Sequence, residues 1–117
     1  MKKLKFDEKF KPCRGNDLLD VSQYGRVRLA DTEIILRQIE IDNHYFVENP
    51  KKPGNEGAFE KVHRLVALTW LGDDYDKSKE VHHINFNSYD NRVDNLKWLD
   101  KGTHEKLHEE RRKEQKG

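Results

Sequence analysis

Residues 80–108 read EVHHINFNSYDNRVDNLKWLDKGTHEKLH, and this stretch decides the fold of the C-terminal half of the chain. Residues 80–84 and 95–99 are predicted to form two short strands, and a polar loop rich in Asn and Asp joins them. A helix is predicted over residues 104–115, because almost all residues there are good helix formers. Thr103 precedes it as the expected N-cap. The stretch therefore predicts a strand–loop–strand–helix unit.

The predicted terminal helix carries histidines where an amphipathic helix would carry apolar residues. Leu107 is its single aliphatic side chain, and an ordinary amphipathic helix would bury more. His104, His108 and Arg111 share the face of Leu107, because residues three and four apart are neighbours on a helix. Imidazoles at positions i and i+4 can bind one divalent metal ion. This face is thus a candidate metal site.

The adjacent pair His82 and His83 lies on the first predicted strand. Neighbouring strand residues point to opposite faces, so one of the two can face the metal while the other stays uncoordinated. A free imidazole can act as a base near neutral pH. Cleavage of a phosphodiester needs such a base and a cation to stabilise the pentacovalent phosphate. The alternatives are a solvated histidine cluster and a purely structural zinc site.

The sequence upstream of this unit predicts a small β-rich region and one core helix. Short, partly alternating runs in residues 18–36 indicate an antiparallel meander, and residues 44–47 indicate a further strand before a long polar loop over residues 49–57. Apolar residues at helical spacing predict an amphipathic helix over residues 59–71. The first dozen residues lack a period and are expected to be an extended or partly disordered arm. The fold class is therefore α+β.

The composition sets the scale of the fold. The 117 residues fit one compact domain, of which 38% are charged and only 33% belong to the hydrophobic set. The core must then be small, and Trp70 and Trp98 are expected to supply much of it. A bound metal would help to stabilise such a chain.

The charge and cysteine content bear on the partner and the compartment. A net charge of +1 does not by itself indicate nucleic acid, but basic residues gather in residues 2–11 and 111–116. The single cysteine, Cys13, excludes an internal disulfide and a cysteine-based zinc finger, and it suits a reducing compartment. The sequence also shows neither an apolar membrane span nor a secretion signal. A cytoplasmic protein without membrane contact is expected.

The C-terminal unit resembles a known family. Residues 82–85 (HHIN) and 90–96 (DNRVDNL), followed by His104 and His108, closely resemble the motif of the HNH endonucleases. The resemblance implies a ββα-metal unit that cuts DNA.

The upstream region resembles segments found in the same proteins. Residues 62–67 (VHRLVA) resemble the helix that precedes the HNH unit in phage and intron-encoded homing endonucleases, and residues 20–28 (DVSQYGRVR) resemble the short NUMOD4-like module that often precedes it. The expected organisation is an arm over residues 1–17, a β-rich NUMOD4-like module over residues 18–58 and an HNH unit over residues 59–117, within one compact domain.

The resemblance also assigns roles to the histidines. It implies that His83 is the general base and that His82 and His104 are metal ligands. His108 matches the last histidine of colicin-like versions of the motif and is expected to be either a third ligand or a phosphate contact. Homing-type relatives often carry Asp at the first ligand position, where this chain has His82. Imidazoles shift the preference towards zinc, nickel or manganese, whereas magnesium prefers oxygen ligands; one divalent ion of these four is expected.

Two asparagines compete for the remaining role. Asn95 corresponds to the central Asn of the motif, which in the family ties down the loop and orients the base. Asn91 is its competitor, and either could instead be a turn residue.

The function implied by the resemblance is metal-dependent hydrolysis of DNA, by nicking or by cutting both strands, in a phage or mobile-element setting within a bacterial or phage-infected cell. The alternative is a non-catalytic nucleic-acid-binding or regulatory protein on the same scaffold. A monomer and a homodimer are both compatible with the sequence. The candidates for contacts with DNA phosphates are Arg64, Lys97, Lys101, Arg111 and Arg112.

Overall fold

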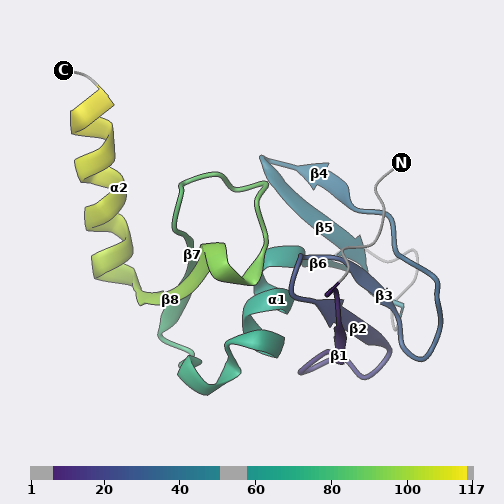
Figure 1. Ribbon diagram of the computed structural model, residues 1–117. Coiled ribbons are helices and arrows are strands. Elements are labelled where there is room, and N and C mark those ends of the chain that lie inside the picture. The colour runs from purple at the N-terminus through teal and green to yellow at the C-terminus, as the bar shows by residue number, and fades with distance from the viewer. Residues whose placement is uncertain (1–6, 51–57, 116–117) are drawn as a thin grey trace.

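Two small antiparallel sheets form the N-terminal half of the molecule. The computed structural model describes residues 7–50 and 58–115 (Figure 1). The first sheet has the order β1-β2-β3, and the second has the order β4-β5-β6. Their strands are β1 (Phe10–Pro12), β2 (Leu19–Ser22), β3 (Val27–Leu29), β4 (Ile39–Ile41), β5 (His44–Glu48) and β6 (Phe59–Lys61).

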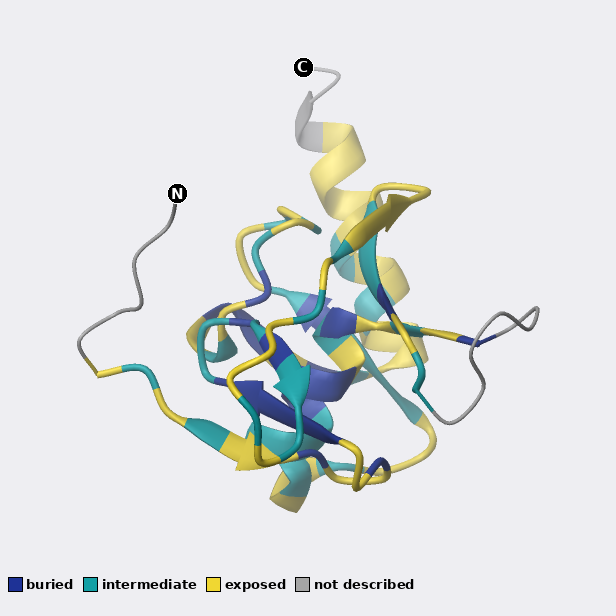
Figure 2. Cartoon of the chain, turned by 90° about the vertical axis from the view of Figure 1, so that its right-hand side faces the viewer, coloured by how far each residue is buried: buried dark blue, intermediate teal, exposed yellow. Residues whose placement is uncertain are grey.

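Helix α1 (Val62–Trp70) packs between these sheets and the C-terminal unit. Its buried residues, at helical spacing, are Val62, Leu65, Val66 and Ala67. Of these, Val62, Leu65 and Val66 meet apolar side chains of β2, β3, β5 and β8 in one core cluster. In Figure 2 the buried residues concentrate on α1 and the strands packed around it. The helix therefore links the N-terminal sheets to the C-terminal unit.

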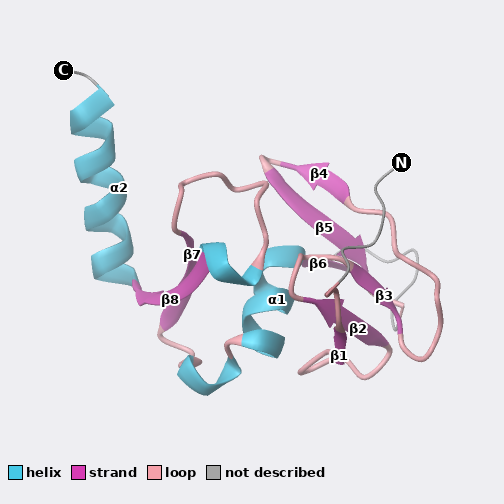
Figure 3. Ribbon diagram, viewed as in Figure 1, coloured by secondary structure: helices cyan, strands magenta, loops and turns pink. Residues whose placement is uncertain are grey.

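The C-terminal unit is a two-stranded sheet followed by a helix. Strand β7 (Lys79–His83) pairs with β8 (Leu96–Asp100), and helix α2 (Lys101–Gln115) follows directly. Short 3-10 turns at Gly72–Asp74 and Val93–Asn95 precede the two strands. Figure 3 shows α2 projecting from the end of β8, away from the N-terminal sheets. The predicted ββα arrangement and the α+β class are confirmed.

The two tryptophans differ in depth. Trp98 is buried, and its indole N–H donates to the Leu71 carbonyl oxygen at 3.0 Å. Trp70 lies only half-buried at the edge of the core, where its indole N–H donates to the Val21 carbonyl oxygen at 2.9 Å. The apolar centre is instead built mainly from aliphatic side chains of the sheets and α1. Trp98 is therefore buried and Trp70 packs against the edge of the core cluster, but the expectation that the two tryptophans supply much of the core is wrong.

The second half of the segment expected as an N-terminal arm, residues 1–17, packs against the rest of the protein. Residues 1–6 lie outside the described part, but β1 pairs with β2. Phe10 stacks under the Arg28 guanidinium at 4.2 Å, and Cys13 and Asn16 are buried. Backbone pairing with a buried strand orders this segment, and its sequence shows no period because only isolated side chains turn inwards.

Two further boundaries differ from the sequence prediction. Residues 32–36 form only an isolated bridge, Arg28 to Ile35, and the strand lies later, at β4. Residues 59–61, expected in the helix, form β6 instead, because their backbone pairs with β5. Hydrogen bonds between distant segments determine both boundaries, and local residue propensities do not predict such pairing. The predicted loop over residues 49–57 falls mostly on residues 51–57, outside the described part.

The N-cap of α2 is Asp100 and not Thr103. The Asp100 carboxylate accepts the Thr103 backbone N–H and its hydroxyl, both at 2.9 Å. This is the N-cap contact one turn earlier than expected, and it places Gly102 inside the helix. In the described residues, no helix has the length and apolar character needed to cross a membrane.

Candidate active site

Strand β7 places its two histidines on opposite faces. His82 is 3% exposed and turns towards α2, where its ring centroid lies 5.2 Å from that of His104 and 6.0 Å from that of His108. His83 turns the other way, and its ring centroid lies 5.1 Å from that of His63 on α1. Because side chains alternate along a strand, the neighbouring residues His82 and His83 belong to two separate histidine clusters.

The cluster on the α2 side has the donor set of a metal site. One ring nitrogen from each of His82, His104 and His108 lies within 4.8 Å of the others. The Nε2 atoms of His104 and His108 are 3.1 Å apart, close to the roughly 3.3 Å expected for two nitrogens on one tetrahedral ion. These three side chains fit one divalent cation.

His82 has a buried ring nitrogen without a hydrogen-bond partner. Its Nδ1 is buried and is the one such side-chain atom in the described residues without a hydrogen bond. Desolvation, followed by the nearby His104 and His108, lowers the pKa of His82 to about 4. The ring is therefore neutral near pH 7 and carries the lone pair that a metal ligand requires.

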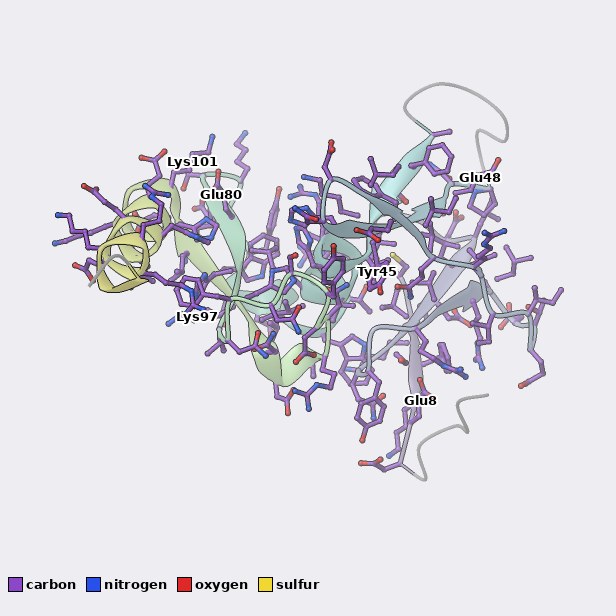
Figure 4. All side chains as sticks on the ribbon, turned by 90° about the horizontal axis from the view of Figure 1, so that it is seen from above. Glu8, Tyr45, Glu48, Glu80, Lys97 and Lys101 are labelled. Atoms are coloured by element: carbon purple, nitrogen blue, oxygen red, sulfur yellow. The ribbon has the colours of Figure 1, made fainter. Side chains whose placement is uncertain are left out.

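Glu80 orients one of the candidate ligands. Nδ1 of His104 donates to Oε2 of Glu80 at 2.9 Å, which leaves Nε2 of His104 facing His108. A carboxylate on the outer nitrogen fixes the tautomer and direction of a ligating histidine. Glu80 was not among the sequence candidates, although it lies two residues before His82 on the same strand and so on the same face. Figure 4 shows Glu80 on β7 beside the start of α2.

Phe86 closes one side of this cluster. Its backbone has φ +62°, which is rare for a bulky residue. Its ring lies edge-on to His82 at 5.0 Å and to His108 at 5.1 Å, and the Arg111 guanidinium covers it at 4.5 Å. The strained conformation thus brings an apolar ring against two candidate ligands. No pattern in the sequence indicates this contact.

Asn91 makes the direct contact with the candidate base. His83 Nε2 donates to Oδ1 of Asn91 at 2.8 Å, which leaves Nδ1 of His83 with a free lone pair. Burial lowers the pKa of His83, and the Asn91 contact partly opposes that shift. Asn91 is itself buried, so its amide is held in place. The ring is therefore fixed in the tautomer that a base requires.

Asn95 ties down the loop instead. Its Oδ1 accepts the Asn85 N–H at 3.0 Å, and its Nδ2 donates to the Asp90 carbonyl oxygen at 2.9 Å. The resemblance to the family implied that Asn95 both holds the loop and orients the base, with Asn91 as its competitor. The structure divides these contacts, because the hydrogen bond to the His83 ring belongs to Asn91.

The two histidine clusters open on one cleft of about 610 Å³. Its wall on the N-terminal side includes His63 and His44, whose ring centroids are 5.3 Å apart. Neither histidine was among the sequence candidates, and both lie beside the candidate base. Lys61 and Lys79 also line the cleft and were not among the sequence candidates.

The five residues predicted to contact DNA lie on the cleft or around α2. Arg64 lines the cleft, and Arg111 covers Phe86. Lys97 pairs with His82 across the β7–β8 ladder and so shares its face. Lys101 begins α2, and Arg112 lines a shallow hollow beside His104 and His108. Figure 4 shows Lys97 and Lys101 near α2, on the opposite side of the molecule from Glu8 and Glu48.

His63 should make the fold sensitive to acid. Desolvation, with His83 and His44 next, lowers its pKa to about 3, from 6.5 in the unfolded chain. Below pH 6.5 the unfolded chain therefore binds a proton that the folded chain does not, and stability falls as the pH drops towards 3. Between pH 7 and pH 5, this site alone should remove about 2 kcal/mol from the free energy of unfolding.

Urea denaturation in the presence of a chelator at both pH values measures this effect. His63→Gln should show a flatter pH dependence than the wild-type chain. An equal loss of stability in the two proteins would exclude His63 as the source.

Comparison with known proteins agrees with this geometry. Residues 60–106 match the family profile described as HNH endonuclease. An uncharacterized HNH endonuclease of Acanthamoeba polyphaga mimivirus is 37% identical over 89 residues, which are 75% of this chain and 22% of that protein. This chain thus spans about a fifth of that relative.

A solved structure shares the fold. A solved structure of DNA binding and cleavage by the HNH homing endonuclease I-HmuI superposes with a TM-score of 0.70 at 22% identity, over 88% of this chain and 59% of that one. The profile match over residues 60–106 covers His63, His82, His83 and His104 and ends before His108. Residues 60–106 thus form a segment of the HNH endonuclease family.

Proposed function

We propose that the protein is a metal-dependent endonuclease that hydrolyses phosphodiester bonds in DNA. The observation that carries this proposal is that the two neighbouring histidines of β7 have different surroundings. His82 joins a three-histidine donor set, whereas His83 keeps a free ring nitrogen, and both sides open on the same cleft. A purely structural zinc site would not need the second, oriented imidazole.

The residues have distinct tasks in this reaction. Nδ1 of His83 takes a proton from water, and the hydroxide attacks phosphorus while the bond to the 3′ oxygen breaks. Asn91 holds His83 in the required tautomer. His82, His104 and His108 would hold one divalent ion, which supplies positive charge for the pentacovalent phosphate and the leaving oxygen. The leaving 3′ oxygen takes a proton from a second water molecule, so the products are a 5′ phosphate and a 3′ hydroxyl.

The cationic side chains would position the DNA backbone. Arg64 stands at the cleft, and Arg111 and Arg112 lie on α2 beside the candidate metal site. Lys97 and Lys101 flank the same region. Contacts of this kind bind phosphates without reading the base sequence, so they position the duplex and weaken with salt.

The finer aspects of the proposal follow from the donor set and the family. Three imidazoles favour zinc, nickel or manganese over magnesium. The NUMOD4-like module over residues 18–58 would precede the HNH unit over residues 59–117. A phage or mobile-element enzyme of this kind would act on DNA in the cytoplasm of a bacterial or infected cell. A non-catalytic DNA-binding protein is the second candidate, and the oriented His83 ring argues against it.

Cleavage of supercoiled plasmid tests the proposal. The purified protein should convert the plasmid to nicked or linear DNA when Zn²⁺, Ni²⁺, Mn²⁺ or Mg²⁺ is supplied, and should stop when EDTA is added. The ratio of nicked to linear product separates single-strand from double-strand cutting. DNA binding without cleavage under all four metals would favour the non-catalytic alternative.

Glu80→Gln should weaken metal binding about tenfold, because the neutral amide no longer fixes and polarises the His104 ring. Titration with Ni²⁺, followed by calorimetry, measures the affinity. Glu33→Gln makes the same change of charge on an exposed residue elsewhere in the chain and should leave the affinity unchanged. Equal affinities for the two variants would show that Glu80 has no part in the metal site.

A further inference from the structure

The turn between β2 and β3 lies against the loop that holds Asn91. Gly25 is buried at φ +83°, and a Cβ added there would lie 3.0 Å from the Asn91 carbonyl oxygen and 3.2 Å from the Asn91 Cβ. The Val93 N–H donates to the Gln23 carbonyl oxygen at 2.9 Å. The Gln38 amide donates to the Gly25 carbonyl oxygen at 2.7 Å. The turn and the loop therefore meet backbone to backbone, with no room for a side chain.

We propose that this turn, residues 22–26, is a positioning element for the base. It sets the place of Asn91, and Asn91 holds the His83 ring through a hydrogen bond of 2.8 Å. The inference rests on the proposed role of His83. The turn belongs to the N-terminal β region and lies more than fifty residues before Asn91. The N-terminal β region would therefore help to form the catalytic geometry.

The tolerance of this arrangement is small. A hydrogen bond from a ring nitrogen to an amide oxygen weakens beyond about 3.2 Å, so a shift of a few tenths of an ångström in the Asn91 backbone is enough to loosen it. Misplacement of a catalytic group by about 1 Å can cost about 100-fold in rate. A smaller shift of Asn91 should therefore cost about tenfold.

Gly15 provides a matched control for Gly25. It also has a left-handed backbone, at φ +90°, but a Cβ added there would meet nothing within 4 Å. Substitution by Asn suits both positions, because Asn tolerates the left-handed region better than other side chains. Both variants then carry the same small backbone cost. Only Gly25→Asn also presses a side chain against Asn91.

The experiment compares Gly25→Asn and Gly15→Asn with the wild-type chain in plasmid cleavage and in nitrogen NMR of the His83 ring at one fixed pH. Gly25→Asn should lower kcat about tenfold with an unchanged KM for DNA. It should also reduce the population of the Nε2–H tautomer of His83. Gly15→Asn should match the wild type in both measurements.

A wild-type tautomer population or a wild-type kcat in folded Gly25→Asn would overturn the proposal. If Gly25→Asn does not fold, Gln38→Met takes its place, since it removes the bond to the Gly25 carbonyl; an unchanged tautomer population there overturns the proposal equally. If the wild-type chain cuts no DNA, the proposed function fails, but the NMR comparison still tests the turn. The two failures are thus distinguishable.

Discussion

His83→Ala should lower the rate constant of plasmid cleavage by about 10²–10⁴-fold, the usual contribution of a general base. The variant loses the ring nitrogen that accepts the proton from water, while the donor set on the other face of β7 keeps all three of its histidines. Metal affinity and DNA affinity should therefore stay close to the wild-type values. Single-turnover cleavage, calorimetry and fluorescence anisotropy measure the three quantities.

Chemical rescue distinguishes a missing base from a general disturbance of the site. Alanine leaves space in the cleft beside His63, so added imidazole should restore part of the lost rate. Undiminished cleavage by His83→Ala would remove this residue from the mechanism. Loss of metal binding in the same variant would mean that the two faces of β7 are not independent.

Zn²⁺ or Ni²⁺ should stabilise the fold strongly, because the donor set joins α2 to β7. At a metal concentration of about 100 times Kd, binding adds about 2.7 kcal/mol. This gain raises Tm by roughly 10 °C for a chain of this size. His82→Ala removes the one fully buried ligand and should abolish most of the rise. Differential scanning calorimetry with and without metal measures it.

His44→Ala is the matched control for that experiment. It removes one imidazole from the same cleft, but His44 lies on the side of His83 and not on that of the donor set. Its Tm should rise with metal as much as that of the wild type. An equal rise in His82→Ala would show that the metal binds elsewhere.

The sequence predicted the C-terminal unit well because its information is local. Strand alternation separates His82 from His83, and helix periodicity places His104 and His108 together, so both follow from spacing alone. The strands of the N-terminal half were harder. Strands β1 and β6 exist because their backbones pair with β2 and β5. No local pattern contains that pairing.

The same distinction holds inside the candidate site. Glu80 could have been found from its spacing to His82, since both lie on one face of β7. The choice between Asn91 and Asn95 could not, because both follow Asp in the same loop and only the path of the backbone decides which amide reaches the His83 ring. The contact between Gly25 and Asn91 joins segments that are remote in sequence. It needs the assembled fold.

The two faces of β7 also bear on how such an enzyme can change over evolutionary time. Glu80 and His82 face α2, whereas Val81 packs on the core and His83 faces the cleft wall formed by α1. Even-numbered positions of the strand thus belong to the candidate metal site, and odd-numbered positions belong to the core and the base. Under the proposed function, substitutions at even-numbered positions would alter ion preference without disturbing proton transfer. Because side chains alternate along the strand, ion preference and proton transfer would depend on substitutions at different positions.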